Sequence, residues 1–522
     1  MSAILALALL LLSITHNEAR AAPPQSTSAE IRTSRALDEA AKTGPAALRG
    51  FLYAMPKGAD LHMHLSGAIY AETFIREAGE DGLCVDPVTL TFVKPMAQTR
   101  SLPPQPVCGE GRVPADAVHK DQHLYDQLID SFSMRTFVPV TGKSGHDQFF
   151  DTFERFDGVG HSFLGEWLDE VASRAASQNE QYLEIMETPT QWKEEAALAA
   201  RIGYHADFVE YRKLLLDAGF RDQIPAIRAT LDEEEAKRKQ IEGCATAAPQ
   251  PACKVEIRYL DQVLRAMPPD SVFAQILLGF ELASADPRVV GLNLVQPEDN
   301  YTAMADYRLH MQMIDALHAL YPNVHISLHA GELALGLVPP EGLKFHIRSA
   351  IEQGHAERIG HGVDVMDEDQ PYDLLKEMAA KRIMVEINLT SNDVILNVKG
   401  GDHPLQMYRK YKVPVALSTD DEGVSRIDLT NEYVRAVDTY HFTYSELKQM
   451  VRTGLEHNFL PGQSLWQPAK EGDDFARPVA ACAGQLGKSE ATGKCADFLK
   501  GSQKATQQFE LERRFKSFEL RF

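Results

Sequence analysis

Eight short strand-like segments alternate with amphipathic helical segments along most of the chain, and this alternation limits the possible folds more than any other feature. Helical segments such as 271–283, 307–320 and 342–353 separate the strands. Strand–helix alternation favours a parallel sheet, and eight such units that close on themselves form a TIM-type (β/α)8 barrel. We therefore predict this α/β fold, with an open doubly wound sheet as the alternative. The predicted strands are 58–64, 182–186, 255–259, 289–295, 324–329, 358–361, 383–389 and 413–419.

Motif and charge content exclude several function classes. No G-x-G-x-x-G pattern follows the first strand and no Walker A pattern occurs, so the usual markers of nucleotide-binding sheets are absent. The chain has 53 basic and 74 acidic residues, a net charge of −21. Because this average field repels polyanions, we expect no nucleic-acid partner. The sequence leaves open whether the chain forms an oligomer.

The N-terminus resembles an export signal. An apolar run at 3–12 is followed by the small-residue pattern Ala19-Arg20-Ala21. This order predicts a secretory signal peptide over 1–21 and a secreted or periplasmic protein. The run is too short for a membrane span, which needs about 20 apolar residues. The alternative is a frayed apolar N-terminus.

Six cysteines fall in three neighbouring pairs. Six cysteines allow 15 pairings, but proximity favours three local loops. An exported chain with an even cysteine count favours disulfides over metal thiolates, and no C-x-x-C spacing occurs. Six free buried thiols are the alternative. The expected pairs are Cys84–Cys108, Cys244–Cys253 and Cys482–Cys495.

Composition shifts divide the rest of the chain. We predict an N-terminal helical arm over 22–50, a barrel over 51–462 and a C-terminal extension over 463–522. Two stretches interrupt the alternation and are interpreted as insertions. One, near 80–119, is rich in Pro and Gly; the other, near 232–254, is a charged helix followed by a cysteine-closed loop.

Three histidine motifs and one aspartate pair lie where predicted strands end. In a barrel, the carboxyl ends of the strands converge on one face, where active sites form. Residues two apart on a strand share a face, so both imidazoles of the H-x-H motif would point inward. Each motif alone is more often structural, but three imidazoles and a carboxylate together suit Zn²⁺. The residues are His62, His64, His329, His361, Asp420 and Asp421.

These motifs, in this order and spacing, resemble the adenosine deaminase family. The matching segments carry MPKGADLHMHLSGAIY, SLHAGE, RIGHG, NLTSN and LSTDD, and LEHNFLPG resembles the family's closing helix. The predicted signal peptide, arm and cysteine-bearing insertions are similar to its secreted, extended, growth-factor-related branch. The matching segments are 55–70, 327–332, 358–362, 388–392, 417–421 and 455–462.

The resemblance implies a zinc-dependent hydrolytic deamination on a (β/α)8 barrel, with one Zn²⁺ per chain. Glu332 would give a proton to purine N1, which makes C6 electrophilic. His361 would orient and deprotonate the attacking water, and Asp421 would bind N7. The implied metal ligands are His62, His64, His329 and Asp420.

Two positions depart from the family pattern. Ser66 stands where many members have an Asp that binds the ribose 5′-hydroxyl, and Gln296 stands where a Gly usually contacts purine N3. We expect His64, Ser66, Gln296 and Asp421 to contact substrate. The predicted reaction is hydrolysis of adenosine or 2′-deoxyadenosine to inosine or 2′-deoxyinosine and ammonia. The alternatives are another metal-dependent hydrolase of amino-purines or cyclic amides, and a non-catalytic secreted binding protein.

Overall fold

The computed structural model describes residues 27–522 except 99–105, 160, 190 and 470–471. The predicted signal peptide, 1–21, therefore lies outside the described residues. Within the described part, no helix is long and apolar enough to cross a membrane.

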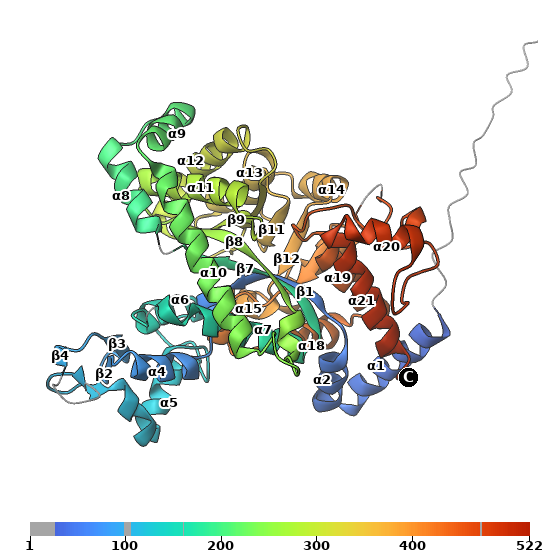
Figure 1. Ribbon diagram of the computed structural model, residues 1–522, viewed down its shortest axis with the longest axis horizontal. Helices are drawn as coiled ribbons and strands as arrows, with labels where there is room; N and C mark the ends of the chain where they lie inside the picture. Colours follow the sequence, from blue (N-terminus) through green and yellow to red (C-terminus); the bar gives the residue numbers. More distant parts are fainter. Residues whose placement is uncertain (1–26, 99–105, 160, 190, 470–471) are drawn as a thin grey trace, which may run out of the picture.

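Eight parallel strands form the barrel at the centre of the molecule (Figure 1). They follow one another around the sheet in chain order, and a parallel bridge between Met63 and Asp420 joins the first strand to the segment after the last. The predicted barrel is confirmed. The strands are β1 (Gly58–His64), β7 (Glu180–Glu187), β8 (Glu256–Leu264), β9 (Val289–Val295), β10 (His325–Ala330), β11 (Arg358–His361), β12 (Met384–Ile387) and β13 (Val415–Leu417).

Helices surround the strands and bury their outer faces. Apolar side chains of strands and helices form one continuous core, which includes Leu183, Leu292 and Leu328. The helices after β1 are α3 (Leu65–Ala68), α4 (Ala71–Glu80), α5 (Gln122–Ser131), α6 (Gly145–Phe156) and α7 (Leu164–Ser177); α8 (Trp192–Ile202), α9 (Phe208–Asp217) and α10 (Ile224–Ile241) follow β7. Later helices are α11 (Pro269–Ala285), α12 (Tyr301–His318), α13 (His346–Glu352), α14 (Pro371–Lys381), α15 (Leu389–Leu396), α16 (Leu405–Lys410), α17 (Glu422–Ser425), α18 (Leu429–Tyr440) and α19 (Tyr444–Glu456).

The last strand is shorter than predicted. We expected it to run to Thr419, but β13 ends at Leu417. Asp420 instead has a left-handed backbone, with φ of 60°. Its N–H donates to the His62 carbonyl at 2.9 Å, and its own carbonyl accepts from His64 N–H at 3.4 Å. These bonds close the barrel at the H-x-H motif, so the chain turns there instead of continuing as a strand.

The N-terminal arm consists of α1 (Ser28–Thr43) and α2 (Pro45–Ala54). The helix breaks at Gly44, whose φ of 126° is left-handed, and Pro45 starts the next helix. The arm packs beside α19 and the C-terminal helix α21 (Gln503–Glu519), and the C-terminus lies next to α1 (Figure 1). The carbonyl of Phe522 accepts from the Arg32 guanidinium at 2.8 Å.

Three disulfides join the predicted cysteine pairs, and the described residues contain no free cysteine. Cys84–Cys108 lies in the insertion after α4, which folds into the short strands β2 (Cys84–Asp86), β3 (Thr91–Val93), β4 (Ala97–Gln98), β5 (Pro106–Val107) and β6 (Val113–Pro114). Cys244–Cys253 closes the loop after α10. Cys482–Cys495 lies in a small separate core with α20 (Gly493–Lys500).

Candidate active site

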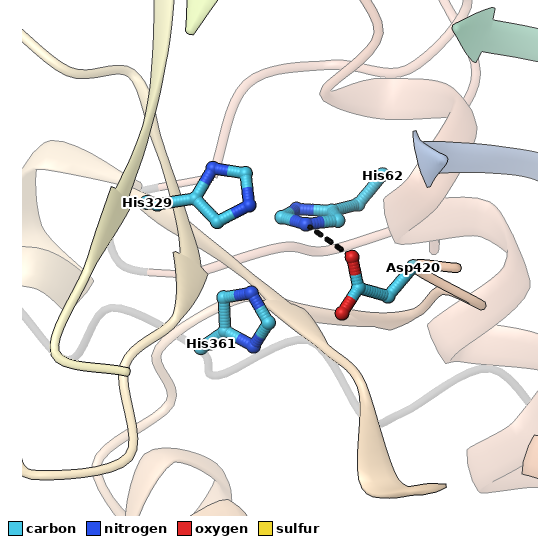
Figure 2. Close-up of side chains that lie close together, drawn as sticks. All are labelled: His62, His329, His361 and Asp420. Carbon is cyan, nitrogen blue, oxygen red and sulfur yellow. Dashed lines mark ion pairs between the residues drawn. The ribbon is translucent and has the colours of Figure 1, made fainter. Parts of the chain in front are cut away.

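The four side chains predicted to bind a metal meet at the edge of the barrel where the carboxyl ends of the strands lie. The Nε2 atoms of His64 and His329 are 3.2 Å apart. Asp420 Oδ1 is 3.3 Å from the Nε2 of His64 and 3.4 Å from that of His62. Figure 2 shows three of these side chains, together with His361, around a shared space. All of these residues are at most 9% exposed.

This arrangement fits a zinc ion. Four tetrahedral ligands about 2.0–2.2 Å from zinc lie roughly 3.3–3.6 Å from one another. The observed separations of 3.2, 3.3 and 3.4 Å are close to this spacing. The Nε2 atom of His62 is buried and finds no hydrogen-bond partner among the described residues. Such a nitrogen atom needs a partner, and a metal ion would supply it.

Each of the three predicted histidine ligands is oriented by a second residue that accepts from its Nδ1. Glu386 holds His62 at 2.7 Å, Gln262 holds His64 at 2.8 Å, and Asn293 holds His329 at 2.8 Å. The Ser391 hydroxyl donates to Asp420 Oδ2 at 2.6 Å. These contacts leave each Nε2 and Asp420 Oδ1 facing the centre, as is usual in metal sites.

Sequence reasoning assigned no role to these orienting residues. A signal was present for two of them, since Glu386 and Asn293 are the isolated polar residues of strands that are otherwise apolar. Gln262 gives no such signal, because its strand also carries Glu256, Arg258 and Asp261. Buried polar side chains need partners, so such residues mark inward-facing positions. The sequence does not say which histidine each one meets.

A glycine makes room for the cluster. A Cβ on Gly360 would lie 2.6 Å from Cε1 of His62, so only glycine allows this close approach. Its neighbour His361 has φ of 69°. His361 and Asp420 thus share a left-handed conformation that non-glycine residues rarely adopt, and such strain concentrates at functional sites.

Glu332 lies two residues after the end of β10 and is 6% exposed. Burial raises the pKa of its carboxyl well above the usual range, and the charges of Asp420 and Glu298 raise it further. Its Oε1 is 3.5 Å from Nδ1 of His361. Burial lowers the pKa of His361 to about 3, so this ring is neutral. A protonated acid beside a neutral imidazole is a pair suited to proton transfer.

Asn392 connects His361 to a further buried histidine. The N–H of Leu405 donates to His403 Nδ1 at 3.1 Å, so the His403 hydrogen is on Nε2, which donates to Asn392 Oδ1 at 3.1 Å. The amide nitrogen of Asn392 then donates to His361 Nδ1 at 2.9 Å. In this network, neutral His361 carries its hydrogen on Nε2.

A cavity of about 420 Å³ opens beside the cluster. This volume is within the range of small-molecule sites. One wall is aromatic and comes from Phe149, Phe150 and Phe153 of α6, which sequence reasoning did not single out. The predicted residues on its lining are His64, Ser66, Gln296, His329, Glu332, Asp420 and Asp421.

The two departures from the family pattern both lie on this lining. Gln296 has a left-handed backbone with φ of 77°, a conformation that favours glycine. Its Oε1 accepts from the N–H of Ala266 at 2.9 Å, so the side chain is anchored to the cavity wall. Ser66 lies on α3 and is half-buried. The neighbouring Gly67 is required, because a Cβ there would lie 1.5 Å from Asp421 Oδ1.

Comparisons with known proteins show the family to which the chain belongs. The family model described as adenosine deaminase matches residues 170–465. An adenosine deaminase of Pectobacterium atrosepticum is 34% identical over 187 residues, 36% of this chain and 50% of that protein. One of Clostridium perfringens is 33% identical over 138 residues, 26% of this chain and 37% of that protein. The chain thus spans about a third to a half of the length of these curated relatives.

Two solved structures are similar to this chain over most of their length. An adenine deaminase from Arthrobacter aurescens has a TM-score of 0.49 and 18% identity, covering 77% of this chain and 94% of that chain. An Arabidopsis N6-mAMP deaminase has a TM-score of 0.48 and 20% identity, covering 78% of this chain and 95% of that chain.

Proposed function

Because the chain belongs to the adenosine deaminase family, we propose that it is a zinc-dependent purine nucleoside deaminase. It hydrolyses adenosine and 2′-deoxyadenosine to inosine and 2′-deoxyinosine, with release of ammonia. One observation carries this proposal: members of a cluster with zinc-ligand spacing and the buried acid Glu332 line a single cavity, and neutral His361 lies 3.5 Å from that acid. These residues lie at the carboxyl-terminal face of the (β/α)8 barrel, which is the face where TIM-barrel enzymes have their active sites.

His62, His64, His329 and Asp420 would hold the metal. When bound, Zn²⁺ supplies a Lewis acid that makes water a nucleophile near neutral pH. Glu332 is the general acid because burial keeps its carboxyl protonated. It gives its proton to purine N1 while water oxygen bonds to C6, and the C6–N1 double-bond electrons move to N1. The C6–N bond then breaks: the amino group takes up the proton that His361 accepted and leaves as ammonia, and the hydroxyl on C6 returns a proton to Glu332 as the C6 carbonyl forms.

His361 orients the attacking water and accepts its proton. Acceptance at Nε2 requires the ring hydrogen on Nδ1, which lies 3.5 Å from Glu332 Oε1. In the structure, the Asn392 amide donates to this Nδ1. The amide must therefore turn away before Nδ1 can carry the hydrogen. Asp421 Oδ1 is buried without a partner among the described residues, which leaves it available to the purine.

Adenosine is expected to be a better substrate than its 5′-phosphate. The described residues that line the cavity include no Lys or Arg, whereas Glu154, Glu332 and Asp421 are acidic. A phosphate dianion would lose its hydration there without gaining a cationic partner. A direct comparison of kcat/KM for adenosine and AMP checks this prediction, and a higher value for AMP would show that Ser66 belongs to a phosphate pocket.

Ser66→Asp provides the matched test of nucleoside binding. A charge-assisted hydrogen bond is worth about 1.5–3 kcal/mol, against about 1 kcal/mol for a neutral one. We therefore expect Ser66→Asp to lower KM for adenosine by roughly tenfold. Adenine, which has no ribose, serves as the control and should show no change. An equal change for both compounds would argue against a contact between Ser66 and the ribose.

Ammonia release from adenosine, with and without a chelator, tests the proposed function. We expect activity that the chelator removes and added Zn²⁺ restores. Release from another amino-heterocycle, but not from adenosine, would identify a different hydrolase of this fold. Zinc binding without any ammonia release over a panel of purines and pyrimidines would favour a non-catalytic binding protein. We also propose that the protein is exported, since its N-terminal segment resembles an export signal and its cysteines form three disulfides.

A further inference from the structure

The general acid Glu332 follows a turn whose backbone is held from outside the cavity. The N–H groups of Gly331 and Glu332 donate to the carboxylate of Glu298, at 3.1 and 2.8 Å. Glu298 lies on the loop after β9 and is 1% exposed. The Glu298 carboxylate therefore accepts from two successive backbone N–H groups, the second of which belongs to Glu332 itself.

A buried histidine holds Glu298 in turn. His346, the first residue of α13, donates from Nδ1 to Glu298 Oε1 at 2.5 Å and is fully buried. Its ring stacks on Tyr307, with centroids 3.8 Å apart and an angle of 12° between the planes. The Tyr307 hydroxyl donates to the His346 carbonyl at 2.8 Å. The histidine is thus fixed by packing and by its backbone, so Glu298 has little freedom to move.

The opposite side of the turn is closed as well. The Gly331 carbonyl accepts from the N–H of Val363 at 2.7 Å. A Cβ on Gly331 would lie 2.4 Å from Asp364 Oδ1 and 2.8 Å from Ile347 Cδ1. The turn is therefore held between Glu298 on one side and 363–364 on the other.

Burial opposes ionisation of Glu298, but the hydrogen bond and charge of His346 outweigh it and lower the pKa of this carboxyl.

We propose that Glu298, held by His346, is a positioning residue for the general acid. It acts through the backbone of 331–332 and keeps the Glu332 carboxyl directed into the cavity, beside His361. Glu298 is not among the described residues that line the cavity, and its hydrogen-bond partners are Gly331, Glu332 and His346, not the predicted metal ligands. This role rests on the proposed function, because it requires that Glu332 donate a proton. Geometry of this kind matters, since small displacements of a catalytic group lower rates strongly.

Glu298→Gln tests the proposal. An amide cannot accept from two backbone N–H groups and a histidine as an ionised carboxylate does. We expect kcat to fall by at least about tenfold, KM to change by less than about twofold, and bound zinc to be retained. Glu368→Gln is the matched control, because buried Glu368 also accepts from two successive backbone N–H groups, those of Ile347 and Arg348, through its Oε1. Its kcat should stay within about twofold of wild type, and an equal loss there would overturn the proposal.

A double-mutant cycle with Glu332→Gln separates positioning from a purely structural effect. If Glu298 acts through Glu332, Glu298→Gln should cause no further loss in the Glu332→Gln background. The same fold-loss in both backgrounds would overturn the proposal. His346→Gln, which leaves the carboxylate in place, should show the same dependence on Glu332 and keeps the test available if Glu298→Gln fails to fold. An inactive wild type would instead overturn the proposed function.

Discussion

His329→Ala is expected to release the metal and to abolish deaminase activity. His329 Nε2 is 3.2 Å from His64 Nε2 in the predicted ligand cluster, and its ring is oriented by Asn293. Alanine leaves three ligands and opens the site to water. Because the metal supplies several kcal/mol of transition-state stabilisation, we expect a loss of roughly a thousandfold or more. Elemental analysis of the purified variant and ammonia release from adenosine measure the two effects.

His325→Ala is the matched control for this variant. His325 lies on the same strand, but its side chain is 42% exposed and pairs with Glu357 at 2.7 Å. Its ring stacks on Phe459, away from the ligand cluster. Zinc content and activity of His325→Ala should be close to those of wild type. Active wild-type protein that contains no transition metal would contradict the assigned metal site and the proposed chemistry together.

Glu332→Gln is expected to lower kcat by at least roughly 10²-fold, the range typical of general acid catalysis. Glutamine keeps the shape of the side chain but has no acidic proton to give to purine N1. The predicted zinc ligands are unchanged, so bound zinc should be retained. Steady-state kinetics and elemental analysis on the same preparation separate this result from metal loss.

Glu341→Gln serves as the control, because this glutamate also follows β10 but is exposed. We expect it to leave kcat unchanged. A Glu332→Gln variant that keeps kcat within about tenfold of wild type would assign the proton donor to another group.

Patterns along the chain predicted the barrel because each strand and helix carries its own local signal. In β1, residues two apart share a face, and this alone placed His62 and His64 on one side; the structure brings both within 3.4 Å of Asp420 Oδ1. Proximity likewise predicted the three disulfides, since short loops close most readily. Local rules were sufficient wherever the partners are close in sequence.

Other parts of the site depend on contacts between distant segments. Glu386 meets His62 across a separation of 324 residues, and Asn293 meets His329 across 36. No hydrophobic periodicity or sequence motif predicts which residues pair across such separations. The aromatic wall from α6 is a similar case, because its helical pattern resembles that of an ordinary core helix. Asp420 was placed at the end of a strand, yet the closing bonds to His62 and His64 turn its backbone into the left-handed region.

The sequence by itself predicted which histidines and aspartates gather at one edge of the barrel. Strand period and strand-end position suffice for that, because the carboxyl ends of parallel strands share one edge; their chemical roles were predicted from the family resemblance. Only the tertiary structure decided how each ring and carboxylate is oriented, and which buried carboxylate holds the turn before Glu332. The reason is physical: orientation depends on hydrogen bonds between buried groups from different strands, and those partners become neighbours only when the barrel closes.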